Sequence, residues 1–415
     1  MITRFKQLTL MITVVATLSF ACQSKKPQAQ EVKEETRPWS QRMADSEMKR
    51  NPSAWQIDFQ KRPKWAYVNG LVCDAILRVW TETGDQKYFD YVLTYADSLI
   101  DENGEILRYK KEDFNIDKIE SGKMLFPLYK QTGDERYRKT IEILFDQLMD
   151  QPRIPEGGFW HKQIYTNQMW LDGIYMGTPF YAKYAVNFGD SAMFDDITLQ
   201  FDLLGSHAKD PETGWYYHGW DATKSVYWAD PETGLSKNFW SRGVGWYYMA
   251  LIDVLDYLPN DHPKKQILID QFKGLSETIV NYQDSAGLWY QVPNYPDREG
   301  NYHESTCAAM FVYGMMKGVD KGVLDKSYIK PAMKGFNGIV NELIIVHPDG
   351  EVELTNCCAG AGLGPADNPV RDGSYQYYIE ETVRSNDGKG TGPFIMAALI
   401  QENSELFKGQ IVETK

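Results

Sequence analysis

Residues 158–194, GFWHKQIYTNQMWLDGIYMGTPFYAKYAVNFGDSAMF, contain one full copy of the pattern that decides the fold. A glycine followed by aromatic residues opens the stretch, and residues 174–188 carry apolar side chains at helical spacing. The turn at 188–190 (Phe-Gly-Asp) follows, and Phe194 stands near the start of the next helical pattern. Gly favours the end of a helix and Asp favours the cap of the next one, so the stretch predicts two helices joined by a tight turn.

The same two kinds of turn recur along the chain. Gly-Asp turns also occur at 83–85 and 132–134, and Gly-led loops begin at Gly104, Gly158, Gly214, Gly287 and Gly350. Apolar residues at helical spacing mark residues 67–83, 88–99, 123–132, 137–148, 174–188, 193–204, 245–258, 265–282, 305–317, 328–341 and 393–401. Runs of strict period two are short and scarce, so the pattern predicts a mainly helical protein.

The length of the repeat favours a closed ring over a solenoid. Between 54 and 73 residues separate successive loop glycines, whereas helical solenoids repeat about every 34 to 47 residues. A helical hairpin plus a loop fits the longer spacing about six times. We therefore predict an all-α fold, an (α/α)6 barrel of six helical hairpins over residues 46–410, with the Gly-aromatic loops gathered at one mouth.

The first residues have the pattern of an export signal. Arg4 and Lys6 precede an apolar stretch at 8–20 that is short for a membrane span, and Cys22 follows a loose lipoprotein cleavage box. We predict a lipoprotein signal peptide at 1–21, lipidation of Cys22 and a flexible tether at 22–45. The protein is then an exported, periplasmic or cell-surface lipoprotein of a bacterium that meets the membrane only through its lipid anchor. An ordinary signal peptide with an incidental Cys is the alternative.

Composition excludes some classes of protein and ligand. The 415 residues hold 44 Lys+Arg against 57 Asp+Glu, a net charge of −13 that argues against a nucleic-acid partner. The 13% of aromatic residues excludes a disordered polymer and indicates an aromatic core or a surface that stacks on sugars. An anionic ligand would have to be attracted by local charges. Neither the cysteines nor the six His have metal or redox spacing, so no metal or cofactor is expected, and Cys73, Cys307, Cys357 and Cys358 are predicted to be buried free thiols.

Two carboxylates are the candidates for acid chemistry, because the motifs of serine hydrolases and phosphate loops are absent. Asp117 and Asp172 each stand at the start of a helix in successive repeats, and a ring would bring these helix starts together. Two close carboxylates do not ionise equally, so one would be a general acid and the other its charged partner. The alternative is an N-cap at each position, and Glu120 even has capping-box spacing from Asp117.

Other candidates surround this pair in the sequence. His161 and His218 end Gly-aromatic loops at matching positions, although a lone His is more often structural. Arg242 lies between Trp240 and Trp246, where a guanidinium could bind a carboxylate and an indole could stack on a sugar. Packing at a helix start is the alternative for that segment. The aromatic Tyr67 is interpreted from its pattern as a core or rim residue.

Six stretches in order resemble the unsaturated rhamnogalacturonyl hydrolases, glycoside hydrolase family 105, and more distantly the unsaturated glucuronyl hydrolases. They are FNIDKIESGKMLFPLY, GGFWHKQIYTNQMWLDGIYMGTPFYAKY, GWYYHGWD, FWSRGVGWYYMALIDVL, YHESTCAAMFVYG and NDGKGTGPF, and the resemblance covers roughly residues 60–400. It implies an (α/α)6 barrel that cleaves a 4,5-unsaturated uronic acid from the non-reducing end of an oligosaccharide. The enzyme would protonate the vinyl ether at C4 and add water at C5, and the hemiketal would then open.

The resemblance also implies roles for single residues. Asp172 would be the general acid and the base that activates water, with Asp117 as its partner. His161, His218, Trp240, Arg242, Trp246 and, as an approximate match, Tyr67 would bind substrate, with Arg242 meeting the uronate carboxylate or the adjoining sugar. The partner is a small oligosaccharide, and a monomer is expected. Two alternatives are an inverting glycosidase on the same barrel and a non-catalytic glycan-binding lipoprotein, and the sugar after the uronide stays open.

Overall fold

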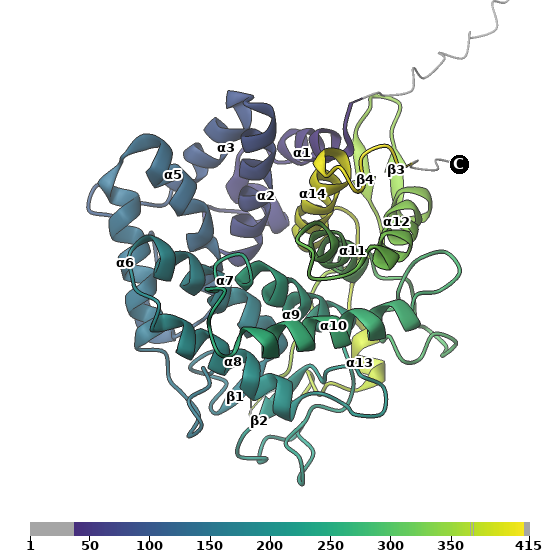
Figure 1. The fold of residues 1–415 in the computed structure, drawn as a ribbon. Coiled ribbons are helices and arrows are strands. Elements are labelled where there is room, and N and C mark those ends of the chain that lie inside the picture. Colours follow the sequence, from purple (N-terminus) through teal and green to yellow (C-terminus); the bar gives the residue numbers. More distant parts are fainter. Residues whose placement is uncertain (1–36, 366, 368, 411–415) are drawn as a thin grey trace, which may run out of the picture. The chain divides into compact units, whose positions relative to one another are not determined.

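A computed structural model describes residues 37–365, 367 and 369–410, which form the mainly helical unit of Figure 1. Its inner helices are α2 (Tyr67–Thr83), α4 (Asp117–Glu120), which a 3₁₀ turn (Ser121–Met124) joins to α5 (Leu125–Thr132), α7 (Leu171–Asn187), α9 (Ser241–Val254), α11 (Ser305–Asp320) and α14 (Gly388–Asn403). Its outer helices are α1 (Trp39–Arg50), α3 (Gln86–Asp97), α6 (Glu135–Met149), α8 (Met193–His207), α10 (Lys265–Asn281) and α12 (Ile329–Gly338).

The inner helices form a closed ring. Each packs against the next, from α2 through α4, α7, α9 and α11 to α14, and α14 packs back against α2. Each inner helix also packs against one outer helix, in the pairs α2–α3, α5–α6, α7–α8, α9–α10, α11–α12 and α14–α1. The predicted (α/α)6 barrel of six helical hairpins is therefore confirmed, with closure now observed as contacts between neighbouring helices.

Short strands occur between the helices. They are β1 (Gln168–Trp170), β2 (Gly219–Asp221), β3 (Ile344–Val346), β4 (Val352–Leu354), β5 (Cys357–Cys358) and β6 (Val383–Arg384), and a short helix, α13 (Tyr375–Glu380), precedes β6. They pair antiparallel as β1–β2, β3–β4 and β5–β6. β1 runs directly into α7, so its pairing with β2 draws two successive loops together at the lower end of Figure 1.

The Gly-Asp turns act as the sequence predicts at two of three sites. Gly84 and Gly133 have left-handed φ values of 69° and 67° after α2 and α5, a conformation in which glycine meets little steric cost. The side chains of Asp85 and Asp134 then cap α3 and α6 by accepting backbone N–H groups. At the third site α7 ends at Asn187 with Phe188 as its cap, and Gly189 is not left-handed.

The predicted tether of 22–45 extends too far, because Trp39–Arg50 form α1, the outer helix of the sixth hairpin. Residues 22–36, the signal peptide and Cys22 lie outside the described residues. Helix α1 is polar, and some of its buried polar groups are paired: Glu47 binds Arg50, and Ser46 accepts a hydrogen bond from the N–H of Val352. Polar residues that form such contacts can be buried at low cost. The polar composition of α1 therefore resembles that of a linker, although the segment is a packed helix.

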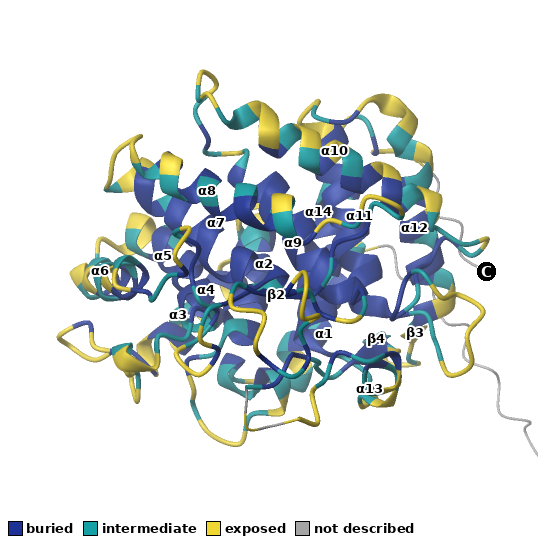
Figure 2. Cartoon of the chain, turned by 90° about the horizontal axis from the view of Figure 1, so that it is seen from below, coloured by how far each residue is buried: buried dark blue, intermediate teal, exposed yellow. Residues whose placement is uncertain are grey.

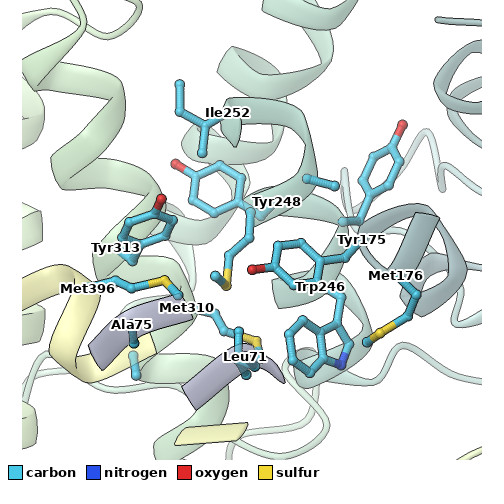
Figure 3. Close-up of a cluster of buried hydrophobic side chains, with 14 of the residues drawn as sticks. Leu71, Ala75, Tyr175, Met176, Trp246, Tyr248, Ile252, Met310, Tyr313 and Met396 are labelled. Carbon is cyan, nitrogen blue, oxygen red and sulfur yellow. The ribbon is translucent and has the colours of Figure 1, made fainter. Parts of the chain in front are cut away.

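Apolar side chains close the centre of the ring below its mouth. Figure 3 shows Leu71 and Ala75 of α2 facing Tyr175 and Met176 of α7, with Trp246 of α9 between them. Each of these side chains is buried. In Figure 2 the central helices are dark blue and the peripheral helices alternate with exposed residues. The barrel interior is therefore a packed core, and a ligand can enter only at a mouth.

Two inner helices begin earlier than their apolar spacing predicts, at Ser241 and Gly388, because glycines occupy their first turns. A side chain at Gly245 would lie 2.6 Å from the sulfur of Met310 on the neighbouring inner helix. Glycine costs helix stability in an isolated helix, but here it allows close packing. The low intrinsic helix preference of these turns explains why the predicted starts are late.

The remaining expectations concern thiols and the membrane. Cys73, Cys307, Cys357 and Cys358 are buried and free, as predicted. Within the described ranges, no helix is both long and apolar enough to cross a bilayer.

Because α1 packs against the ring on one face only, substitutions on its buried face should destabilise the protein more than substitutions on its exposed face. Met43 is fully buried, so Met43→Ala should lower the free energy of unfolding by about 2–5 kcal/mol, the cost of a lost core side chain and its cavity. Lys49→Ala, on the exposed face of the same helix, should leave the unfolding midpoint nearly unchanged. Denaturant unfolding followed by circular dichroism measures both, and equal tolerance of the two changes would contradict a packed α1.

Candidate active site

The candidate residues lie at the N-termini of the inner helices. Asp117 is the first residue of α4, Asp172 is the second residue of α7 and Arg242 is the second residue of α9. Tyr67 is the first residue of α2. Because neighbouring inner helices pack side by side, equivalent first turns of successive helices meet around one mouth. The ring therefore brings together side chains that are far apart in the sequence.

A repeated backbone contact sets the register of these helix starts. The N–H group just before or at the start of four inner helices donates to a carbonyl in the loop that leads to the next inner helix. The pairs are Ile116 to His161 (3.2 Å), Leu171 to His218 (3.1 Å), Ser241 to Gln291 (3.1 Å) and Ser305 to Asn356 (3.1 Å). His161 and His218 thus occupy equivalent positions, as their matching loops predict, and Gln291 takes the same place in the third repeat.

Each His side chain reaches the carboxylate of the preceding inner helix. His161 Nε2 lies 3.2 Å from Asp117 Oδ1, and His218 Nε2 lies 3.1 Å from Asp172 Oδ2. The two rings meet on Trp170, which stacks on His161 at a centroid distance of 4.4 Å and contacts His218 edge-on at 5.6 Å. The two His–Asp pairs therefore share one wall, in line with the prediction that both carboxylates belong to one site.

Asp117 is held in its ionised form. Lys162 Nζ lies 2.6 Å from Asp117 Oδ2, on the opposite oxygen from His161. Burial raises the pKa of this carboxyl, but the positive charge of Lys162 and the contact with His161 outweigh burial and hold the pKa well below its ordinary value. Asp117 therefore suits the role of the charged partner. Lys162 was not predicted as a site residue from its sequence pattern, although it directly follows His161.

Asp172 lies at the centre of the cluster. Its side chain is 14% exposed and its Oδ2 approaches His218. A side chain at Gly243 on the next helix would come within 3.5 Å of the same oxygen, so the glycine keeps the space beside Asp172 open. His218 is fully buried, and its other nitrogen lies 2.8 Å from the hydroxyl of Tyr378 in α13. Burial raises the pKa of Tyr378 well above its ordinary value, so this hydroxyl keeps its proton.

Tyr378 could not be found from a local pattern, because it lies 160 residues from His218 in the sequence. If its hydroxyl donates to His218 Nδ1, the imidazole carries its hydrogen on Nε2 and donates it to Asp172 Oδ2. The other carboxyl oxygen of Asp172 is then left for a substrate. The contact chain from Tyr378 through His218 thus orients the carboxyl group.

Arg242 supplies a buried positive charge at the same mouth. Its Nη1 donates to the carbonyl of Cys358 at 2.5 Å, and its guanidinium lies 4.7 Å from the ring centre of Trp240. Its Nε, by contrast, is buried without a hydrogen-bond partner among the described residues. A buried N–H group without a partner is costly, and a bound anion would satisfy it.

The aromatic candidates support the site more than they line it. Trp240 and Trp246 are each 1% exposed, so neither offers a ring face to solvent. Trp240 packs between His218 and Tyr378, and Trp246 lies beneath Tyr67 at a centroid distance of 6.3 Å. The stacking of a sugar on these indoles, predicted from the sequence, is not supported by their burial. Burial also raises the pKa of Tyr67 well above its ordinary value, which keeps its hydroxyl protonated.

The electrostatics of the mouth differ from those of the whole chain. Several inner helices direct their N-termini, and thus the positive ends of their dipoles, toward the cluster. Lys162 and Arg242 add two full charges there. Within residues 37–365, 367 and 369–410, no group of three or more His, Cys, Asp or Glu side chains could hold a metal ion. The arrangement fits an anionic ligand bound by the cations and the helix N-termini. The carboxyl group of Asp172 lies at the same mouth, where it could exchange a proton with that ligand.

Comparisons with known proteins give the family. The model of glycosyl hydrolase family 88 matches residues 39–403. Protein Atu3128 of Agrobacterium fabrum is 34% identical over 226 residues, which make up 54% of this chain and 96% of that protein. The unsaturated rhamnogalacturonyl hydrolase YesR of Bacillus subtilis is 24% identical over 294 residues, 69% of this chain and 78% of that one.

A solved structure agrees with these relatives. The family 105 glycoside hydrolase of C. acetobutylicum ATCC 824 superimposes with a TM-score of 0.84 at 42% identity, covering 88% of this chain and 99% of that one. Fold and matches together define an α/α-barrel glycosidase. The chain belongs to glycosyl hydrolase family 88, and the resemblance to family 105 predicted from six motifs is confirmed. The catalytic and binding roles of single residues in this chain stay predictions.

The pairing of Lys162 with Asp117 leads to a prediction about pH. In Lys162→Gln the main opposing charge is lost, so burial should raise the pKa of Asp117. Asp117 would then take up a proton at a higher pH, and the acid side of the kcat/KM profile should shift upward in pH. Lys110→Gln removes an exposed cation from a nearby loop and serves as the control. An unshifted acid limb in Lys162→Gln would show that the charge of Asp117 is not required.

Proposed function

We propose that this glycosidase releases a 4,5-unsaturated uronic acid from the non-reducing end of lyase-generated oligosaccharides by hydrating its vinyl ether. The contact chain from Tyr378 through His218 to Asp172, at the mouth where Lys162 and Arg242 add positive charge, is the observation that carries the proposal. It presents an oriented carboxyl group for proton transfer at a mouth whose positive charges would attract a uronate carboxylate. The name of YesR, an unsaturated rhamnogalacturonyl hydrolase, supports this class of substrate.

In the proposed reaction Asp172 acts twice. As an acid it gives its proton to C4 of the double bond, and positive charge develops at C5 and the ring oxygen. As a carboxylate it then takes a proton from the water that attacks C5, which restores its starting state. The resulting hemiketal opens without further catalysis and releases the neighbouring sugar. No covalent bond to the enzyme forms, so the spacing rule for the two carboxylates of ordinary glycosidases does not apply.

The neighbours of Asp172 have supporting roles in this proposal. Ionised Asp117, held by Lys162 and His161, would accept hydrogen bonds from the sugar hydroxyls. Arg242 would bind the uronate carboxylate, since a guanidinium can form charge-assisted hydrogen bonds with it. The finer substrate, with rhamnose after the uronide, is proposed from the resemblance.

An inverting glycosidase on the same barrel remains the alternative, and the substrate separates it from the proposal. Hydration requires the double bond, so the enzyme should cleave unsaturated oligosaccharides and leave their saturated counterparts intact. In D2O, the first turnover should place one deuterium at C4, which nuclear magnetic resonance can detect. Methylation of the uronate carboxyl should raise KM, because Arg242 would lose its charged partner. Cleavage of saturated substrates at a similar rate would overturn the hydration mechanism.

The central prediction concerns Asp172. Asp172→Asn cannot donate or accept the reacting proton, so kcat should fall by about 10²–10⁴-fold, measured as loss of the ultraviolet absorbance of the unsaturated uronide. Circular dichroism should show an intact fold. Asp90→Asn, which changes an exposed carboxylate on α3, is the matched control and should retain activity. Substantial activity in Asp172→Asn would refute the assignment.

We also propose that the enzyme is a monomer exported as a lipoprotein anchored through Cys22. The basic and apolar pattern of residues 1–21 and the Cys that follows support this. In bacteria grown with a radioactive fatty acid, the wild-type protein should become labelled and Cys22→Ser should not. Equal labelling of both would refute the anchor.

A further inference from the structure

A second pocket, of about 250 Å³, lies beside the candidate active site. Its lining includes four cations and two aromatic residues, together with one carboxylate, Asp113: the cations and aromatic residues are Arg62, Lys64, Trp65, Arg108, Tyr109 and Lys118. The mechanism proposed above uses none of them, and the sequence motifs do not include the first five. The proposed reaction therefore does not account for the charge of this pocket.

The pocket opens at the same mouth as the active site. Its walls come from the segment just before α2 and from the loop just before α4, so both precede the N-terminus of an inner helix. Trp65 joins them, because its indole N–H donates to the carbonyl of Lys118 at 2.8 Å. Lys118 directly follows Asp117, and the two side chains diverge. Asp117 contacts His161 and Lys162, whereas Lys118 turns toward Asp113.

The same loop is tied to the active site by a second contact. The N–H of Gln163 donates to the carbonyl of Asp113 at 3.3 Å. Gln163 follows Lys162, which holds Asp117. The pocket and the active site are thus neighbouring parts of one mouth, and an oligosaccharide bound in the active site could extend into the pocket.

Charge is the distinctive property of this pocket. Lys118 is paired with Asp113 at 2.6 Å, but Arg62, Lys64 and Arg108 have no ion-pair partner among the described residues. All three are exposed, so water weakens their mutual repulsion, but together they leave the hollow with a net positive charge. Such a concentration is unexpected in a chain with a net charge of −13, in which carboxylates are plentiful. An anionic ligand would supply the missing counter-charge.

The walls of the pocket are firmly held. Trp65 is 5% exposed and stacks on Tyr95, and the hydroxyl of Tyr109 donates to Gln147 at 2.5 Å. Arg108 has a φ of 59°, a left-handed conformation that costs a residue with a side chain about 1–2 kcal/mol. Backbone hydrogen bonds of Leu107 and Tyr109 hold the loop on both sides of it. Strain of this kind is frequent where a side chain must point at a ligand.

We propose that this pocket binds an anionic group, a sulfate ester or a second uronate carboxylate, on a sugar to the reducing-end side of the unsaturated uronide. The inference rests on the proposed function. Because the unsaturated uronide is the terminal sugar, any group bound outside the active site belongs to the rest of the oligosaccharide. The pocket then selects oligosaccharides that carry a second negative charge.

Kinetics of a double variant test this proposal. R62Q/K64Q removes two unpaired cations of the pocket, and K130Q/K273Q removes two exposed cations of the outer surface as a control with the same change in net charge. For unsaturated oligosaccharides with a sulfate ester, or with a second uronate, kcat/KM of R62Q/K64Q should fall about five- to tenfold. For an unsaturated disaccharide with a neutral second sugar, it should stay within about twofold of the wild type.

The substrates also distinguish the two sources of charge. A loss for the sulfated but not the second-uronate substrate assigns the pocket to sulfate, and the reverse result assigns it to carboxylate. An equal effect of R62Q/K64Q on charged and neutral substrates, or an equal effect of the control variant, would overturn the proposal while the hydrolase function stands.

Binding gives a readout that does not depend on turnover. Titration calorimetry with the sulfated and second-uronate oligosaccharides, performed on Asp172→Asn with and without R62Q/K64Q, should show about five- to tenfold weaker binding in the triple variant. If the wild type hydrolyses no unsaturated substrate, the proposed function fails, and this titration alone decides on the pocket. Unchanged affinity would then overturn the pocket as well.

Discussion

The unpaired backbone N–H groups at the start of each inner helix are the constraint on which the site depends. A helix leaves its first N–H groups without internal partners, and burial at the centre of a ring makes this costly. In four repeats the loop of the following repeat supplies a carbonyl. Because His161 and His218 provide two of these carbonyls, their side chains are placed against Asp117 and Asp172 by the same contact that joins neighbouring repeats. Fold and site therefore share one set of hydrogen bonds.

Features repeated in the sequence could be predicted, and features formed by distant or locally unusual residues could not. The helical spacing, the Gly-Asp turns and the length of the repeat led to the six-hairpin ring, and matching loops led to His161 and His218. The polar helix α1 was missed because contacts such as that of Ser46 with Val352 form only in the folded ring. Tyr378 was missed because its partner lies 160 residues away. The burial of Trp240 and Trp246 depends on tertiary packing, which spacing does not reveal.

The contrast between global and local charge explains how an acidic protein can bind an anion. The net charge of −13 repels a uronide at long range, but salt screens that repulsion within about 10 Å. At contact distance the proposed ligand would meet Arg242, Lys162 and the positive ends of helix dipoles. Burial strengthens these interactions, because water no longer weakens them. Under this proposal a few groups at the mouth decide the affinity.

The pairing of α1 with α14 has a consequence for how the ring is made. The sixth hairpin joins the first helix of the ring with the last one, so their contacts span nearly the whole length of the barrel. During synthesis the first five hairpins can form in turn, but the α1–α14 contacts must wait until residues 388–403 have left the ribosome. Until then the inner faces of α2 and α11 lack a neighbour and expose apolar surface. Closure of the ring is thus a late, long-range step, at which a growing chain is most prone to aggregate.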